Sequence, residues 1–263
     1  MIEWAEVDGI AVLTLARPPV NALDAELCTA VAEGLRGPGV DGVRAVVLTG
    51  AGRAFSAGVD LRSVVDGGVD YPRRLLPALT DVFRTAFTLP VPLVSAVNGH
   101  AIAGGCVLAA CADVVLMSEG RIGLPEVRVG VPFPRSAVEV VRHAVGDGGA
   151  GRLMLGGETV SAAEAVAVGL VDRVVATDEL QAAALAAAAE LADRMPADTF
   201  AHTKAQLRRD AVARMDAHAD EDAPATELGA ERLRDGRYEC LVVAKPINLV
   251  GGVGTPANAT AVR

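Results

Sequence analysis

The sequence has no apolar run long enough to cross a membrane. Its longest run, from Ala101 to Ala112, is interrupted by glycines and falls far short of the roughly 20 residues that a membrane-spanning helix needs. The first residues, from Met1 to Glu6, also lack the basic and apolar stretches of a secretory signal. We therefore expect a cytoplasmic protein that does not bind membranes.

Basic residues are scarce as well. The chain of 263 residues contains 24 Lys and Arg against 33 Asp and Glu, which gives a net charge of −9. Nucleic-acid-binding proteins concentrate basic residues, but the basic pairs here, Arg73-Arg74 and Arg208-Arg209, are short and stand near acidic residues. We expect no nucleic-acid partner. The composition is still compatible with a small anionic ligand, because one helix N-terminus with one or two cationic side chains can hold a phosphate.

The cysteines show neither the pattern of a metal site nor that of a disulfide framework. Cys28, Cys106, Cys111 and Cys240 form no Cys-x-x-Cys pair and have no histidine at metal-ligand spacing. We expect buried free thiols and no metal.

The composition that remains, with 51% hydrophobic and 22% charged residues, is that of an ordinary globular protein. The length suits one large domain, or one domain with a small helical appendage. Turn signals and periodicity predict an α/β fold, with β-α units in the first half and mainly helices after about residue 134. The fold is predicted to begin with a hairpin over 2–15. Strands buried on both faces are predicted at 43–49, 93–97 and 114–118.

Helices are predicted at 24–36, 71–89, 104–112 and 181–195, and a capping box of Ser161 with Glu164 starts another. A short strand is predicted at 170–175. Two loops rich in small residues follow buried strands, Gly50–Leu61 and Asn98–Cys106. Ligand crevices of open α/β sheets lie at the carboxyl ends of strands, and exposed N–H groups there can stabilise an oxyanion. Each loop alone is a weak signal, because Gly and Ala also simply permit tight turns.

Taken together, the two loops resemble those of the crotonase (enoyl-CoA hydratase/isomerase) superfamily. Asn21-Ala22-Leu23 before the first loop, Leu124-Pro125-Glu126 after the second, and the stretch 153–174 add to the resemblance, which covers roughly residues 1 to 210. It implies a spiral of β-β-α units with a helical C-terminal region that forms trimers, often paired into hexamers. We therefore divide the chain into a spiral core (1–195), a helical oligomerisation region (196–240) and an irregular tail (241–263).

The resemblance also implies a substrate, an acyl group carried as a coenzyme A thioester, and no further cofactor. The backbone N–H groups of Val59 and Gly104 would hold the thioester oxygen. Ala57 would lie near the adenine, and Arg62 stands where the family often keeps a basic residue near the CoA phosphates. Predicted contacts to the substrate are thus Ala57, Asp60, Arg62 and Gly105.

The carboxylates bear on the reaction class. Hydratases of this family use two glutamates, but Val107 stands at the first position and Glu126 alone is kept. One carboxylate can move a proton between the α and γ carbons, whereas hydration also needs a water held and deprotonated, which two carboxylates do better. We therefore expect an isomerase-like double-bond shift. Hydration by Glu126 alone, and a member that binds CoA esters without turnover, are the alternatives.

Two further positions depart from the family or invite another interpretation. Phe133–Ala137 is bulkier than the Gly-rich run usual there, although Pro134 is acceptable at a helix N-terminus. His100 precedes the second loop and could be an acid–base group, but we expect a packed or hydrogen-bonded histidine.

Overall fold

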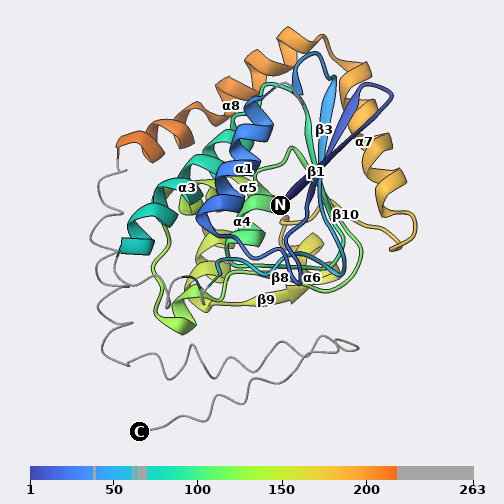
Figure 1. Ribbon diagram of the computed structural model, residues 1–263. Coiled ribbons are helices and arrows are strands. Elements are labelled where there is room, and N and C mark those ends of the chain that lie inside the picture. The colour runs from blue at the N-terminus through green and yellow to red at the C-terminus, as the bar shows by residue number, and fades with distance from the viewer. Residues whose placement is uncertain (38–39, 61–62, 64–69, 218–263) are drawn as a thin grey trace, which may run out of the picture.

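The computed structural model describes residues 1–37, 40–60, 63 and 70–217 (Figure 1). The chain begins with the predicted hairpin: β1 (Ile2–Val7) pairs antiparallel with β2 (Ile10–Leu15). Asp8 and Gly9 form the turn with φ of 51° and 74°. Two positive φ values at a two-residue turn match the right-handed twist of the strands, which explains why Asp-Gly occupies it.

The larger sheet has six strands in the order β1-β2-β3-β5-β7-β10. Its further strands are β3 (Ala45–Gly50), β5 (Leu93–Val97), β7 (Val114–Met117) and β10 (Arg173–Val174). The pairs from β2 to β10 are all parallel. The apolar runs predicted as buried strands correspond to β3, β5 and β7, whereas the strand predicted at 170–175 shortens to the two residues of β10.

A second sheet of four short strands was not predicted. It consists of β4 (Ala54–Ser56), β6 (His100–Ile102), β8 (Arg121–Gly123) and β9 (Thr159–Ser161) in that order. β4, β6 and β8 are parallel, and β9 is antiparallel to β8. Each of β3, β5 and β7 is thus followed by a strand of the small sheet and then by a helix. This is the spiral of β-β-α units that the resemblance implies.

The helices cover both faces of the large sheet. They are α1 (Ala25–Arg36), α3 (Asp70–Phe87), α4 (Gly104–Ala110), α5 (Arg135–Ala150), the π-helical turn η3 (Gly151–Leu155), α6 (Ala162–Ala167), α7 (Leu180–Arg194) and α8 (Ala197–Ala217). Figure 1 shows α7 on one side of the strands and α1, α3, α4 and α5 on the other. Alternation along β2 explains this, because Ile10 and Val12 face α7 while Leu13 and Leu15 face the other layer.

Local signals define the helix ends as predicted. Asp24 caps α1 by accepting from the Leu27 N–H at 2.7 Å, and it pairs with Arg17. Ser161 and Glu164 form the capping box of α6. Pro134 immediately precedes α5.

The expectations for the cysteines and for the C-terminal region can be compared with the structure only in part, because some of these residues lie outside the described ones. Cys28, Cys106 and Cys111 are buried free thiols, as predicted, and Cys240 lies outside the described residues. α8 begins the predicted oligomerisation region; the rest of that region and the tail lie outside them too. Among the helices that are described, none is both long and apolar enough to span a bilayer.

Candidate active site

Three segments that the sequence places far apart meet at one edge of the small sheet. The chain leaves β4 toward Val59, β6 toward Gly104 and β8 toward Glu126. These three strands are neighbours and parallel, with Ile102 opposite Gly123, so their carboxyl ends lie side by side. From the sequence, the two loops are expected directly after the long buried strands. The structure corrects this expectation, because each loop first forms a strand of the small sheet.

The side chain of Asn21 fixes the first loop through hydrogen bonds to its backbone. Its side chain is buried, and its Nδ2 donates to the carbonyls of Ala51, Ala54 and Phe55 at 3.0, 2.8 and 3.2 Å. Its Oδ1 accepts from the Arg17 N–H at 3.0 Å. An amide supplies both donors and an acceptor, so one side chain satisfies several loop groups. In the sequence Asn21 is only one residue of the family resemblance, and no pattern there indicates this hydrogen-bonding role.

Two more polar side chains brace the loops, and sequence reasoning missed both. Asn98 donates from Nδ2 to the Gly50 carbonyl at 2.8 Å and accepts from the Gly50 N–H at 3.2 Å. The Ser56 hydroxyl donates to the Asn21 carbonyl at 2.8 Å and accepts from the Gly58 N–H at 3.2 Å. The available signal was a polar residue inside an otherwise small or apolar segment, which predicts a buried hydrogen-bonding role.

The backbone of Val59 is oriented by a bridge to Leu23. The Leu23 N–H donates to the Gly58 carbonyl at 2.7 Å, and the Asp60 N–H donates to the Leu23 carbonyl at 2.8 Å. In a parallel bridge of this kind the intervening residue directs its own N–H to the other side of the strand. Within the described part of the chain, the Val59 N–H makes no hydrogen bond.

Gly104 begins α4, where helix N–H groups have no intrahelical acceptor. Among the described residues its N–H also has no hydrogen-bond partner. Gly58 packs against this turn: a Cβ built on Gly58 would lie 2.6 Å from the Ile102 carbonyl oxygen and 3.3 Å from the Gly104 nitrogen. A Cβ on Gly105 would lie 2.5 Å from the Ser56 carbonyl oxygen. The two loops therefore approach so closely that only glycine fits at these contacts.

Glu126 opens the short helix η2 (Glu126–Val129) after β8. Its Oε2 atom is buried and, within the described residues, has no hydrogen-bond partner. Burial raises the pKa of this carboxyl group to about 8, against the opposing effect of its own backbone N–H. The group can thus both accept and release a proton near neutral pH.

The helix α4 offers no second carboxylate. Its residues, Gly104–Ala110, include no Asp or Glu. Val107, at the position of the family's first glutamate, is 1% exposed and belongs to the apolar core. Of the two positions at which the family's hydratases carry a glutamate, the one at Glu126 therefore holds a carboxylate here and the one at Val107 does not.

The other predicted residues differ in what the structure shows of them. Ala57 is half-buried, and its N–H donates to the Val20 carbonyl at 3.0 Å. Asp60 accepts from the Ser63 N–H and hydroxyl at 3.3 and 2.9 Å. Arg62 lies outside the described residues.

His100 is hydrogen-bonded, as expected. Its Nδ1 accepts from the Arg121 N–H at 3.2 Å. Burial, and then the charge of Arg121, lower the pKa of this imidazole.

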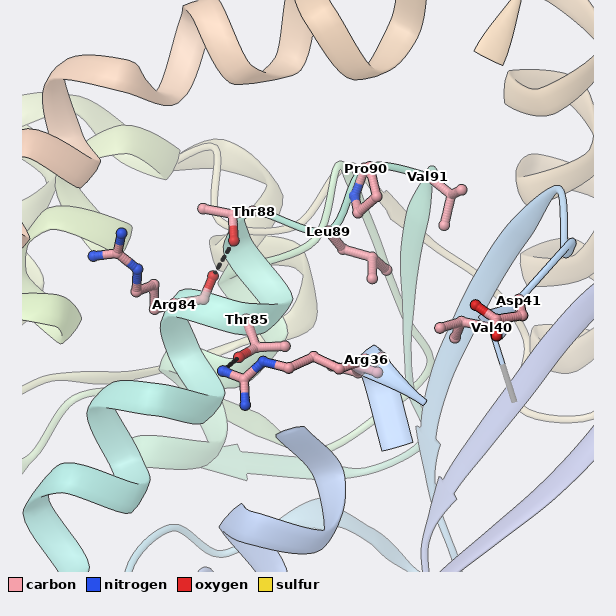
Figure 2. Close-up of a pocket in the computed structure, with 10 residues that line it drawn as sticks. Arg36, Val40, Asp41, Arg84, Thr85, Thr88, Leu89, Pro90 and Val91 are labelled. Carbon is pink, nitrogen blue, oxygen red and sulfur yellow. Dashed lines mark hydrogen bonds between the residues drawn. The ribbon is translucent and has the colours of Figure 1, made fainter. Parts of the chain in front are cut away.

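The part of the chain that is described contains no group of three or more His, Cys, Asp or Glu side chains able to hold a metal ion. A pocket of about 430 Å³ lies elsewhere, beside the ends of α1 and α3 and the residues before β5 (Figure 2). Its arginines already have partners: Arg36 binds Asp81 and Thr85, and Arg84 binds Asp216. This pocket is at the amino end of β5, away from Glu126.

The sequence matches the enoyl-CoA hydratase/isomerase family over residues 5–227. The chain belongs to this family. It is 42% identical over 175 residues to an enoyl-CoA hydratase, so named, of Thermus thermophilus, a match that spans 64% of this chain and 69% of that protein. It is 33% identical over 185 residues to the mitochondrial enoyl-CoA delta isomerase 1 of Mus musculus, spanning 68% of this chain and 64% of that protein.

Solved structures of family members share the fold. EchA3 of Mycobacterium tuberculosis, named as an enoyl-CoA hydratase, has a TM-score of 0.79 at 29% identity, covering 89% of this chain and 99% of that chain. A second structure of that same protein, named there as an enoyl-CoA isomerase, has a TM-score of 0.77 at 28% identity, covering 85% and 97%. The resemblance to the crotonase superfamily is confirmed, and the relatives carry both activity names.

Proposed function

We propose that this family member shifts the double bond of an enoyl-CoA thioester, with Glu126 as its acid–base group. The observation that carries the proposal is the buried Oε2 atom of Glu126, which has no partner in the described part of the chain. It lies at the carboxyl end of β8, next to the strands that lead to Val59 and Gly104. Their N–H groups are the two donors that an enolate oxygen requires.

The reaction needs one group that takes a proton and returns it. Ionised Glu126 removes a proton from C2 of a 3-enoyl-CoA, and negative charge develops on the thioester oxygen. The N–H groups of Val59 and Gly104 donate to that oxygen; one such donor is typically worth about 2.7–4 kcal/mol. Protonated Glu126 then delivers the proton to C4, the carbonyl re-forms, and the product is the 2-enoyl-CoA. Atoms balance without water or an oxidant.

The surroundings of Glu126 favour this cycle. A general base works best when its pKa is near the operating pH, and burial brings the pKa of Glu126 to about 8. In this proposal coenzyme A is part of the substrate, Ala57 lies near its adenine, and Arg62 pairs with its phosphates. Asp60 and Gly105 complete the wall of the site.

We also propose that residues 196–240 assemble the chain into a trimer or hexamer. A monomer mass by light scattering at micromolar concentration would contradict this.

Hydration is the second candidate, because the Thermus thermophilus relative is named as a hydratase. Adding water to a 2-enoyl-CoA needs a group that holds and deprotonates the water, and α4 supplies no carboxylate for it. Val107 is packed in the apolar core, so its side chain cannot orient water. The geometry therefore supports isomerisation better than hydration by Glu126 alone.

Product analysis separates the candidates. The purified protein is incubated with 3-enoyl-CoA and 2-enoyl-CoA thioesters in separate reactions. We expect conversion of the 3-enoyl to the 2-enoyl thioester, and hydration of crotonyl-CoA far below the usual enzymatic turnover of about 10 s⁻¹. Hydration at that rate would overturn the isomerase assignment. Affinity for these esters without any product would identify a binding protein instead.

Glu126→Gln tests the assigned residue. The substitution keeps the shape of the side chain and removes proton transfer, so we expect kcat to fall by about 10²–10⁴-fold while acyl-CoA affinity changes little. Glu158→Gln is the matched control, since Glu158 is exposed and its backbone carbonyl accepts from the Leu124 N–H at 2.9 Å. Activity of Glu126→Gln within a few-fold of the control would contradict the role.

A further inference from the structure

Arg208 of α8 binds the C-terminal ends of two other helices, α3 and α4. The residue is buried, with 6% of its surface exposed. Its Nη1 donates to the carbonyl of Phe87, the last residue of α3, and to the Cys111 carbonyl at 3.0 Å. Its Nη2 donates to the Ala112 carbonyl at 3.2 Å, and Cys111 and Ala112 directly follow α4. The last carbonyls of a helix have no donor within that helix, so Arg208 supplies one from a third helix.

The opposite end of α4 carries the candidate oxyanion donor. The Gly104 N–H belongs to the same planar peptide group as the Ala103 carbonyl. That carbonyl accepts from the N–H groups of Cys106 and Val107 at 2.9 and 3.1 Å. The first turn of α4 therefore also orients the Gly104 N–H.

A row of hydrogen-bonded peptide groups connects the two ends of α4. Along the helix, N–H groups donate to the carbonyls four residues earlier. At its C-terminal end, the Ala112 N–H donates to the Ala109 carbonyl at 3.3 Å, and the Cys111 carbonyl of the same peptide group accepts from Arg208. Hydrogen bonds in such a chain polarise one another. The guanidinium of Arg208 is thus joined through this row to the Gly104 N–H.

Ala103 holds the Gly104 donor in an unusual backbone conformation. Its φ is 54° and its ψ is −127°, values that residues with a Cβ rarely adopt. Such a conformation persists only where the surrounding contacts hold it. The Ala103 N–H donates to the Gly123 carbonyl at 2.8 Å, and the Ala103 carbonyl is held by α4. The direction of the Gly104 N–H consequently depends on the position of α4, whose far end Arg208 binds.

We propose that Arg208 is a positioning residue for the oxyanion donor at Gly104. The inference rests on the proposed function, in which the Gly104 N–H donates to the thioester oxygen. Arg208 acts without touching the substrate: it fixes the far end of α4 and polarises the row of peptide groups toward the developing negative charge. A guanidinium suits this task because it stays protonated and presents several N–H donors in one plane. Asp113 accepts from its Nη2 at 2.8 Å and fixes the orientation of that plane.

Arg208→Met tests the proposal by kinetics. The substitution keeps an unbranched apolar side chain and removes the guanidinium. We expect kcat for conversion of the 3-enoyl thioester to fall about tenfold, a part of the roughly 10²–10³-fold loss that removal of a whole oxyanion donor causes. KM should change little, because the weakened interaction is one that strengthens in the transition state.

Infrared spectroscopy of a bound thioester is the readout that a merely structural role would not move. Butanoyl-CoA has no double bond to shift, and a heavy-carbon label at its thioester carbonyl isolates that one stretch in a difference spectrum. Hydrogen bonds to a carbonyl oxygen lower its stretching frequency, so the frequency in wild type should lie below that in solution. In Arg208→Met the stretch should return part of the way to its value in solution.

Lys204→Met is the matched control. Lys204 lies one turn earlier on α8, is also 6% exposed and shares Asp113 with Arg208. Its Nζ donates to Asp113 at 2.6 Å and to the Val91 carbonyl at 3.3 Å, and in the described structure it binds no carbonyl of α4. Its removal should lower stability to a similar degree but leave kcat and the carbonyl stretch as in wild type. Equal changes of the stretch in Lys204→Met and Arg208→Met would overturn the proposal.

Arg208→Lys decides if Arg208→Met does not fold, as judged by its thermal unfolding. An ammonium group keeps the charge beside Asp113 but lacks the planar set of donors that reaches several carbonyls at once. The stretch should therefore still move toward its value in solution, and a stretch at the wild-type frequency overturns the inference.

The wild-type spectrum separates this inference from the proposed function. A bound thioester whose stretch in wild type equals that in solution refutes the proposed oxyanion site. A lowered wild-type stretch that neither Arg208 variant moves refutes only the role of Arg208.

Discussion

Two carboxylates shielded from water, Asp113 and Glu126, have opposite surroundings. Asp113 precedes β7 and accepts from Lys204 Nζ at 2.6 Å, from Arg208 Nη2 at 2.8 Å and from the Leu93 N–H at 2.8 Å. These bonds fasten α8 to the body of the molecule. Glu126, by contrast, has a buried Oε2 atom that no donor of the described residues reaches.

The difference separates carboxylates that stabilise the fold from one whose buried oxygen has no partner among the described residues. Glu139 resembles Asp113: it is fully buried and pairs with Arg135, Arg142 and Arg214. Where a buried charge serves the fold, then, the chain surrounds it with cations and N–H groups, as the cost of burial demands. An unpartnered carboxyl group with a perturbed pKa carries that cost without structural benefit, which is the usual mark of a functional site.

The largest loss of stability is expected from substitution of Asp113, whose carboxylate is paired with Lys204 and Arg208. Asp113→Asn leaves the cations of Lys204 and Arg208 buried without their counter-charge. Removing one partner of a buried ion pair typically costs about 3–5 kcal/mol, so the free energy of unfolding should drop by that amount. Urea denaturation measures it as a lower midpoint at an unchanged m-value.

A second variant distinguishes loss of charge from general damage. Adding Lys204→Met to Asp113→Asn removes one orphaned cation together with its partner. We expect the double variant to be more stable than the sum of the single effects, because the two residues share one interaction. Strict additivity would show that the Asp113–Lys204 pair does not hold α8.

The fold was predictable from sequence where local chemistry decides it. The Asp-Gly turn and the cap at Asp24 depend on neighbours within a few residues, and both appear as predicted. The small sheet escaped prediction because β4, β6 and β8 have three residues each. That length is too short for a readable alternation, and only pairing with distant strands makes these segments extended.

The residues of the candidate site come from the family resemblance, whereas their electrostatic surroundings could not be predicted from sequence. The resemblance singled out Glu126, Val59 and Gly104, and the structure brings their strands together. Whether a given carboxylate is paired depends on partners remote in sequence; Lys204 lies 91 residues from Asp113. Side-chain roles such as that of Asn21 likewise depend on tertiary contacts that periodicity does not report.

Substitution of Glu126, whose buried Oε2 atom has no partner in the described part of the chain, should raise the free energy of unfolding, whereas substitution of Asp113 lowers it. Glu126→Gln removes a carboxyl group that is poorly solvated in the folded state and well solvated in the unfolded state. Near pH 8 the variant should therefore be more stable than wild type, by about 4 kcal/mol, because the pKa rises from 4.5 to about 8 and each unit corresponds to about 1.4 kcal/mol. Thermal and urea unfolding of both proteins at the same pH give the difference.

The pH dependence of this gain follows from the pKa values. The carboxyl group of Glu126 has an ordinary value of 4.5 and about 8 in the folded protein. Between these values the folded state holds a proton that the unfolded state has released, so wild-type stability falls as pH rises through this window. Glutamine does not titrate. The two proteins should thus be equally stable near pH 4.5 and diverge toward pH 8; a gain that is the same at both pH values would contradict burial of the charge as its cause.

The smallest effect is expected at an ion pair on the surface, between Arg44 and Asp193 of α7. Their side chains are 45% and 63% exposed, so water screens the attraction that burial would strengthen. Asp193→Asn should cost about 0–1 kcal/mol, and Arg44 keeps its bond to the Asp8 carbonyl at 3.1 Å. Salt should erase the difference, because exposed pairs are screened over about 8 Å at physiological ionic strength, whereas the Asp113→Asn loss should persist. A salt-independent loss at Asp193 as large as that at Asp113 would show that burial is not what separates these sites, and the contrast between Asp113 and Glu126 would then lose its physical basis.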